Sequence, residues 1–119
     1  GRRGPGGAVV VAEQPVAVVE VDAAPGAGDR TILLTDPDAN LRAFAATSLG
    51  SQQPVQSATI SALMQALSDE DALVRSSAAD ALGRLGRGAR RARSALYKAT
   101  SDPDPGVKRA ARDALRRLR

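Results

Sequence analysis

The chain has 119 residues, a formal net charge of +4, and neither cysteine nor histidine. These absences exclude a disulfide framework, a Cys/His metal site, a histidine base and a thiol nucleophile, and with them most familiar catalytic sites. The length fits one domain with a modest core. No apolar run approaches the roughly 20 residues of a membrane span, so we expect a soluble protein, with the cytoplasm as the favoured compartment.

Residues 1–29 differ from the rest of the chain because they are rich in glycine, proline and valine. Breakers such as Pro15, Pro25 and Gly26 rule out a long helix here. The stretch PVAVVEV at 15–21 can form a short strand, but a strand without a partner is marginal in water. We therefore expect an extended or flexible arm over 1–29, with an ordered strand packed on another element as the alternative.

From residue 30 the chain repeats itself every 33 residues. The segments DPDANLRAFAATSLG, DEDALVRSSAADALG and DPDPGVKRAARDALR align without a gap from Asp36, Asp69 and Asp102. Five columns keep their residue type in all three copies: Asp38/Asp71/Asp104, Leu41/Val74/Val107, Arg42/Arg75/Lys108, Ala45/Ala78/Ala111 and Leu49/Leu82/Leu115. Copies in register at this many columns predict equivalent structural units.

Each copy has the pattern of one helix. The aspartates of the first column are placed to cap its start, and Pro105 fits the first helical position. Apolar residues then recur with helical periodicity; in the second copy they are Val74, Ala78, Ala81, Leu82 and Leu85. The alanines among them are small enough to let helices approach closely. We expect Gly50, and Gly83 with Gly86, to end these helices.

A second helix is predicted between successive copies. It should begin at Pro54 and present an apolar face that includes Ile60, Leu63 and Met64. In the first unit the equivalent helix should cover about 21–34, but the proline and glycines there leave one turn, Thr31 to Leu34. The fold class is therefore all-α: a short α-solenoid of about two and a half helix-turn-helix repeats over 30–119, behind an irregular N-terminal arm.

The pattern D…VR…AA.ALG over residues 30–119 resembles the HEAT-like repeat family, specifically the short bacterial type first described in phycobilisome lyases. The resemblance implies a right-handed α-solenoid whose second helices line a concave face. It says little about activity, because the family includes scaffolds, regulators, lyase subunits and nucleic-acid enzymes.

Two recurring charged features have structural interpretations that we favour. Arg42, Arg75 and Lys108 should pair with aspartates of their own or the adjacent repeat, as similar positions do in HEAT-like arrays, rather than form a basic ladder for an anionic ligand. The carboxylates of TDPD, SDED and SDPD should cap helices, because they lack the glycine and distal glutamate of a calcium loop.

Charge is distributed unevenly along the chain. Residues 83–119 carry a net charge of +9, whereas residues 1–82 carry −5. Arg109, Arg112, Arg116 and Arg119 follow a helical spacing that aligns them in one exposed stripe. We favour a solvated terminal cap for this stripe, then protein binding or self-association, and last nucleic acid, because stacking aromatics and a DNA-reading motif are missing.

These observations favour a non-catalytic protein–protein interaction or scaffold module, with no cofactor or metal, that binds through its second-helix face. The partner would be a protein, with an acidic protein as one candidate, or a second copy of the chain, and the arm would cap the first repeat or dock onto a neighbouring chain. One alternative is binding of nucleic acid or another polyanion by the basic C-terminal third, and another is an accessory subunit of a lyase-type complex. The candidate partner-binding residues are Arg75, Ala79, Asp80, Arg109, Arg112 and Arg116.

Overall fold

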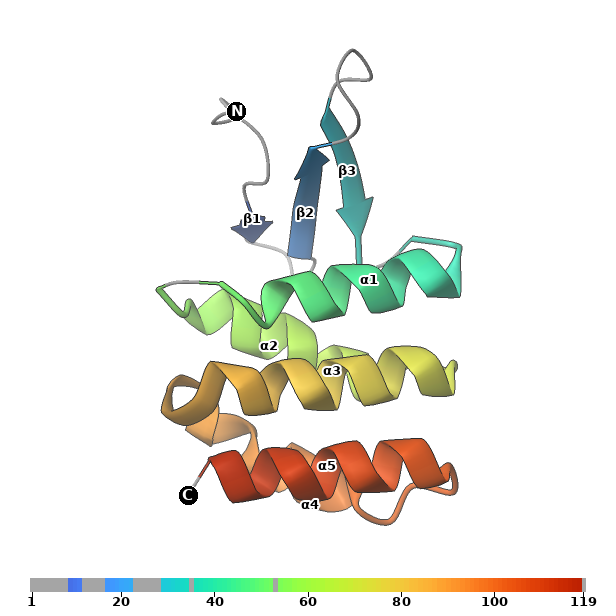
Figure 1. Ribbon diagram of the computed structural model, residues 1–119, viewed down its shortest axis with the longest axis vertical. Coiled ribbons are helices and arrows are strands. Elements are labelled where there is room, and N and C mark those ends of the chain that lie inside the picture. Colours follow the sequence, from blue (N-terminus) through green and yellow to red (C-terminus); the bar gives the residue numbers. More distant parts are fainter. Residues whose placement is uncertain (1–8, 12–16, 23–28, 35, 53, 119) are drawn as a thin grey trace.

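The computed structural model describes residues 9–11, 17–22, 29–34, 36–52 and 54–118, with side chains from Leu34 onward. The described part begins with three strands, β1 (Val9–Val11), β2 (Ala17–Asp22) and β3 (Asp29–Leu33). They form one antiparallel sheet in the order β1-β2-β3, in which Val10 lies opposite Val18 and Glu20 opposite Thr31. The sheet stands at one end of the molecule, next to the first helix (Figure 1).

The sheet bears on two expectations about the N-terminal arm. Within the described residues of 1–29 the chain forms strands, which are extended and agree with the alternative of an ordered strand packed on another element. The predicted helical turn from Thr31 to Leu34 is wrong, because β3 runs to Leu33 there. The physical reason is pairing with β2, which suits the β-branched Thr31 and Ile32 better than an isolated turn of helix does.

The rest of the described chain is helical, which confirms the all-α repeat fold. The elements are α1 (Ala39–Leu49), α2 (Ser57–Ala66), α3 (Ala72–Leu85), the 3-10 helix η1 (Gly86–Ala92), α4 (Arg93–Ala99) and α5 (Pro105–Arg117). We call α1 the second helix of unit 1, α2 and α3 unit 2, and η1, α4 and α5 unit 3. The second helices α1, α3 and α5 lie side by side in one layer, and α2 and α4 form the layer behind them (Figure 1).

The predicted aspartate caps begin the second helices. A side-chain oxygen of Asp38 accepts from the N–H of Asn40 at 2.8 Å, and Asp71 accepts from Leu73 at the same distance. Asp104 caps α5 by accepting from the N–H of Val107, one residue further along, at 3.1 Å. Each cap satisfies an N–H group that the first turn of a helix leaves without a partner, so these carboxylates serve the fold.

One predicted helix boundary is wrong, because α2 begins at Ser57, three residues after Pro54. Of the two glycines expected to end α3, Gly86 does so with a positive φ of 67°, whereas the helix continues past Gly83 to Leu85. Gly83 is therefore a packing residue, not a terminator. A Cβ atom on it would lie 2.8 Å from Cα of Ala114 on α5, and one on Gly50 would lie 2.9 Å from Cα of Ala81 on α3.

These contacts set how closely the units stack. Glycine at the end of one second helix meets alanine on the next, so two backbones touch without an intervening side chain. The core between the layers is aliphatic and almost free of polar atoms; its fully buried larger side chains include Leu49, Leu63, Val74, Leu82 and Leu96. Uniform, tight stacking of this kind holds the exposed positions of each unit in fixed register.

Candidate functional site

The repeated basic column joins consecutive units. Nε and Nη2 of Arg42 donate to the two carboxylate oxygens of Asp69, both at 2.9 Å. Its Nη1 donates to the backbone carbonyls of Asp36 at 2.9 Å and Pro37 at 3.1 Å. One guanidinium group therefore holds the loop before α1 and the loop before α3 together.

Arg75 repeats these contacts one unit later. It donates to Asp102 at 2.8 and 3.1 Å and to the backbone carbonyls of Asp69 at 2.9 Å and Glu70 at 3.1 Å. We call the pairs Arg42–Asp69 and Arg75–Asp102 the inter-unit clamps. They confirm for Arg42 and Arg75 that this column pairs with aspartates of the adjacent repeat, whereas Lys108 makes no ion pair within 4.0 Å with another described residue. Arg75, a predicted partner-binding residue, is thus already engaged inside the stack.

The clamps shift the protonation equilibria of their members. Burial would raise the pKa of Asp69, but the hydrogen bonds from Arg42 and from the N–H of Asp71 outweigh it, and the pKa is lowered. The guanidinium of Arg75 lowers the pKa of Asp102 through its hydrogen bonds, against the opposing effect of desolvation. The same bonds raise the pKa of both arginines, so the clamps are ionised at neutral pH.

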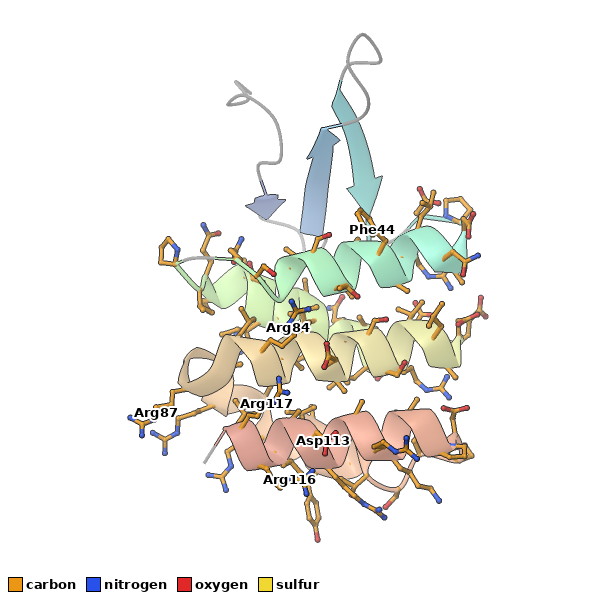
Figure 2. All side chains as sticks on the ribbon, in the orientation of Figure 1. Phe44, Arg84, Arg87, Asp113, Arg116 and Arg117 are labelled. Carbon is orange, nitrogen blue, oxygen red and sulfur yellow. The ribbon has the colours of Figure 1, made fainter. Side chains whose placement is uncertain are left out.

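The outer surface of the second helices is formed by exposed and half-buried residues. We call it the second-helix face; it consists of stripes at helical spacing on α1 and just after it (Asn40, Phe44, Thr47, Ser51), on α3 (Leu73, Ser77, Asp80, Arg84) and on α5 (Gly106, Ala110, Asp113, Arg117). Figure 2 shows four of its members, Phe44, Arg84, Asp113 and Arg117. Its charged members, Asp80, Arg84, Asp113 and Arg117, have no net formal charge. Arg84 lies 3.7 Å from Asp80, and Asp113 pairs with Arg116, which lies outside this face.

Two apolar side chains interrupt this polar face. Phe44 is 45% exposed and Leu73 is 49% exposed, and with Tyr97 they are the exposed large apolar residues of the described chain. None was among the predicted site residues. The alignment of the three copies held a signal, because each of these residues is large and apolar where the other copies have small or polar ones. Phe44 shares its column with Ser77 and Ala110, and Leu73 shares its column with Asn40 and Gly106.

The other predicted partner-binding residues fall into three environments. Asp80 is exposed on the second-helix face. Ala79, for which an outward or groove-facing position was predicted, is fully buried, because α5 stacks over this side of α3. Arg109, Arg112 and Arg116 are exposed, but they lie where a further unit would stack rather than on the second-helix face.

Comparison of equivalent positions in units 2 and 3 defines the surface that carries Arg109, Arg112 and Arg116. Three positions of α3 that lie toward α5 are Ser76, Ala79 and Gly83, and their counterparts in unit 3 are arginines. The first helices behave alike, because apolar residues of α2 are replaced on α4 and just after it by polar ones or by tyrosine. We call the resulting surface the end face; it consists of Arg93, Tyr97, Thr100, Arg109, Arg112 and Arg116.

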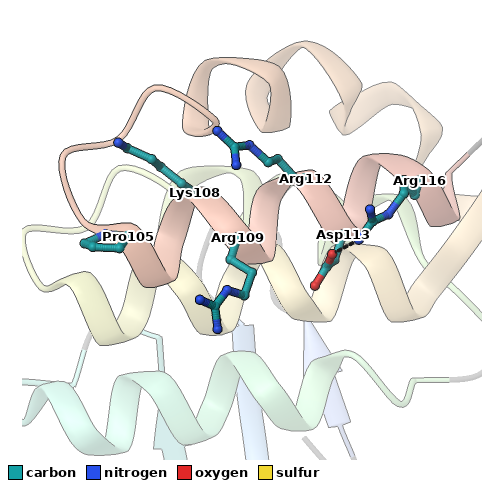
Figure 3. Close-up of a pocket in the computed structure, with 6 residues that line it drawn as sticks. All are labelled: Pro105, Lys108, Arg109, Arg112, Asp113 and Arg116. Carbon is teal, nitrogen blue, oxygen red and sulfur yellow. Dashed lines mark hydrogen bonds and ion pairs between the residues drawn. The ribbon is translucent and has the colours of Figure 1, made fainter.

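The end face is open and cationic. One hollow of about 410 Å³ along α5 is lined by Pro105, Lys108, Arg109, Arg112, Asp113 and Arg116. Arg112 extends from α5 toward α4, whereas Arg109 extends to the other side of the helix (Figure 3). A second hollow of about 420 Å³ shares Arg112 and Arg116 and adds Arg93, Tyr97, Thr100 and Leu115. Tyr97 is 72% exposed there.

Two searches for other kinds of site give negative results for the described residues. No group of three or more acidic, histidine or cysteine side chains is placed to hold a metal ion in the part of the chain that the structure describes. No helix among the same residues has the length and apolar character needed to cross a bilayer.

Comparison with models of protein families gives a match. A family model described as HEAT repeats matches residues 30–118, which is most of the chain and includes each helix that the structure describes. The match is to HEAT repeats in general and does not single out the phycobilisome-lyase type. No curated protein matches the chain.

Proposed function

This chain belongs to the HEAT-repeat family, and from that premise we propose that it is a non-catalytic protein-interaction module that binds its partner through the second-helix face. HEAT repeats are generally protein-interaction scaffolds. A stacked array presents the same surface of successive helices at regular intervals, which suits an extended contact with another polypeptide.

One observation carries the proposal: Phe44 and Leu73 are both exposed on this face, on adjacent helices that the inter-unit clamp holds in register. Exposed apolar anchors on rigid elements, surrounded by polar residues, are the usual core of a protein–protein interface. The self-compensated charges around them, Asp80 with Arg84 for example, suit the polar rim of such an interface.

The test compares capture of binding proteins by the wild-type chain and by a Phe44→Ser/Leu73→Ser variant. The matched control is Gln65→Ser/Lys98→Ser, which alters two exposed residues of the first helices. Thermal unfolding of all three chains verifies that they fold. The expected result is a protein that binds the wild type and the control, and that binds the double variant at least tenfold more weakly when purified.

The proposal is wrong if each purified partner binds the double variant as tightly as the wild type. A second candidate, binding of a polyanion, is favoured by Tyr97 lying beside Arg93 and Arg112 in one hollow. The accessory role in a lyase-type complex stays a prediction, because the family match neither supports nor contradicts it.

A further inference from the structure

We infer that the end face of unit 3 docks a helix of a partner protein that carries a stripe of carboxylates, an inference that rests on the proposed protein-binding function. The end face is the side of unit 3 that corresponds to the side of unit 2 on which α5 packs against α3. Its overall form therefore already suits a helix. In units 1 and 2 the contact is made by glycine and alanine, such as Gly83 against Ala114. Arg116 replaces that glycine, so a helix docked here sits further out and meets charged groups.

The charge of the end face is more specific than a solvated cap requires. Any polar residue keeps a terminal unit soluble, whereas Arg109, Arg112 and Arg116 all have the same sign. Like charges three and four residues apart on a helix repel one another and destabilise it. This repulsion is relieved when an anionic partner binds. A surface of mixed charge would have no such repulsion for a partner to relieve.

Few carboxylates of the chain itself neutralise these groups. Asp113 pairs with Arg116. Arg93, Arg109 and Arg112 make no ion pair with another described residue within 4.0 Å. Their guanidinium groups are exposed and present planar donors, which match carboxylates in a bidentate geometry.

The arrangement also supplies an apolar anchor. Tyr97 and Leu115 line the hollow between α4 and α5 together with Arg112. Tyrosine and arginine are the residue types most enriched at the energetic centres of protein interfaces. A partner helix can therefore place an apolar side chain against Tyr97 and carboxylates against the arginines.

The spacing along α5 defines the stripe that fits. With a rise of about 1.5 Å per residue, the Cα atoms of Arg109 and Arg112 are about 4.5 Å apart along the helix axis, and those of Arg112 and Arg116 about 6 Å. The exposed side chain of Arg109 extends to the other side of α5 and has to reorient to join this row (Figure 3). Glutamates at positions i, i+4 and i+7 of an antiparallel helix have the same two intervals.

Asp113 favours a protein helix over a nucleic acid. Its carboxylate lines the same hollow as Arg109 and Arg112. A phosphate backbone is charged at every nucleotide, so a phosphate in this hollow would be repelled by the carboxylate of Asp113. A helix can instead place a neutral residue opposite Asp113. Sites for single strands also stack successive bases on aromatic side chains, and the end face offers Tyr97 alone for this purpose.

The experiment measures binding of the full chain to a fluorescent helical peptide with glutamates at i, i+4 and i+7, by anisotropy at 50 and 150 mM salt. An isomeric peptide with the glutamates on different faces has equal charge, and single-stranded oligothymidine tests a phosphate backbone. The variant is Arg112→Glu. Its control, Arg87→Glu, makes the same charge change on η1, where Arg87 points away from the body of the molecule (Figure 2).

We expect the wild type to bind the striped peptide at least fivefold more tightly than the isomer and the oligonucleotide. Arg112→Glu should weaken this binding at least tenfold and Arg87→Glu by less than twofold. Equal binding of the isomer or the oligonucleotide, equal loss in both variants, or no binding at 50 mM salt each overturns the inference. The Phe44→Ser/Leu73→Ser variant should still bind the peptide. Failure of the end face and failure of the second-helix face are therefore seen separately.

Discussion

At the scale of single residues, Gly83 sets the distance between α3 and α5. A methyl group at this position would lie 2.8 Å from Cα of Ala114 and 3.0 Å from its Cβ. The nearest atom belongs to a backbone, so the clash is relieved only if one helix moves. The opposing effect is helix propensity, which favours alanine over glycine inside a helix by about 1 kcal/mol.

We expect Gly83→Ala to lower the free energy of unfolding by about 1–2 kcal/mol, because overpacking against a backbone costs more than propensity returns. Urea denaturation measures this. Gly106→Ala is the control without a backbone clash, since a Cβ there meets only the carboxylate oxygen of Asp104, at 3.0 Å, the same oxygen that accepts from the N–H of Val107. It should destabilise the chain less than Gly83→Ala does, because a side-chain oxygen shifts more easily than a backbone. A Gly83→Ala chain as stable as the wild type would show that the stack is looser than described.

The clamp aspartates make stability depend on pH. The pKa values of Asp69 and Asp102 are below their ordinary value of 3.8 in the folded chain. The unfolded chain therefore binds more protons around and below this pH, and the clamps' contribution is complete above it and is lost as the pH falls further.

Asp69→Asn/Asp102→Asn should lower the free energy of unfolding at pH 7. The free energy of unfolding should also fall less steeply with decreasing pH in this variant than in the wild type. The measurement is the free energy of unfolding from about pH 7 to pH 2. The other carboxylates titrate in both chains, so the difference between the two curves isolates the clamps. Curves that stay parallel through the acid range would argue against ionised clamps.

At the scale of elements, α5 combines two roles in one amphipathic helix. Val107, Ala111, Ala114 and Leu118 are buried against α3 and α4, while the arginines cover the opposite side. Arg112 lies three or four residues from Lys108, Arg109 and Arg116, and each such pair of like charges costs about 0.2–0.5 kcal/mol.

Arg112→Gln should therefore stabilise the chain by about 1 kcal/mol at low salt, and the gain should vanish as salt screens the charges. Thermal unfolding at 10 and 500 mM NaCl measures it. Arg84→Gln is the control of opposite sign, because Arg84 lies 3.7 Å from Asp80 at an i,i+4 spacing and its loss should be slightly destabilising. Destabilisation by Arg112→Gln at low salt would mean that the arginine row has a stabilising contact.

The same helix shows how far the sequence can be interpreted. The caps and clamp residues could be predicted, because they recur in register and each satisfies a local or next-unit requirement. Exposure in the column Ala46/Ala79/Arg112 could not, because it depends on whether another unit covers the helix. Likewise, β3 depends on pairing with β2, a non-local contact that local pattern does not reveal.

At the scale of the whole molecule, the two ends of the stack are finished differently. The end face presents charged side chains, whereas at the other end β2 and β3 approach α1, and β2 also approaches α2. Leu34, directly after β3, is buried in the core between the layers. A unit without a complete first helix leaves its second helix uncovered on one side, and the sheet occupies that position (Figure 1).

Deletion of residues 1–28 removes β1 and β2 and leaves β3 without a strand partner. If the sheet caps unit 1, the melting temperature should fall by at least about 5 °C, because lost cover over α1 and α2 costs 1 kcal/mol or more in a domain of this size. Deletion of residues 1–8, which precede β1, is the control and should leave it unchanged. Light scattering on all three chains separates capping from docking on a neighbouring chain, since docking would change the oligomeric mass of the truncated protein. Unchanged melting temperature and unchanged mass would contradict both roles, and α1 would then have to be stable on the clamp and the glycine contact alone.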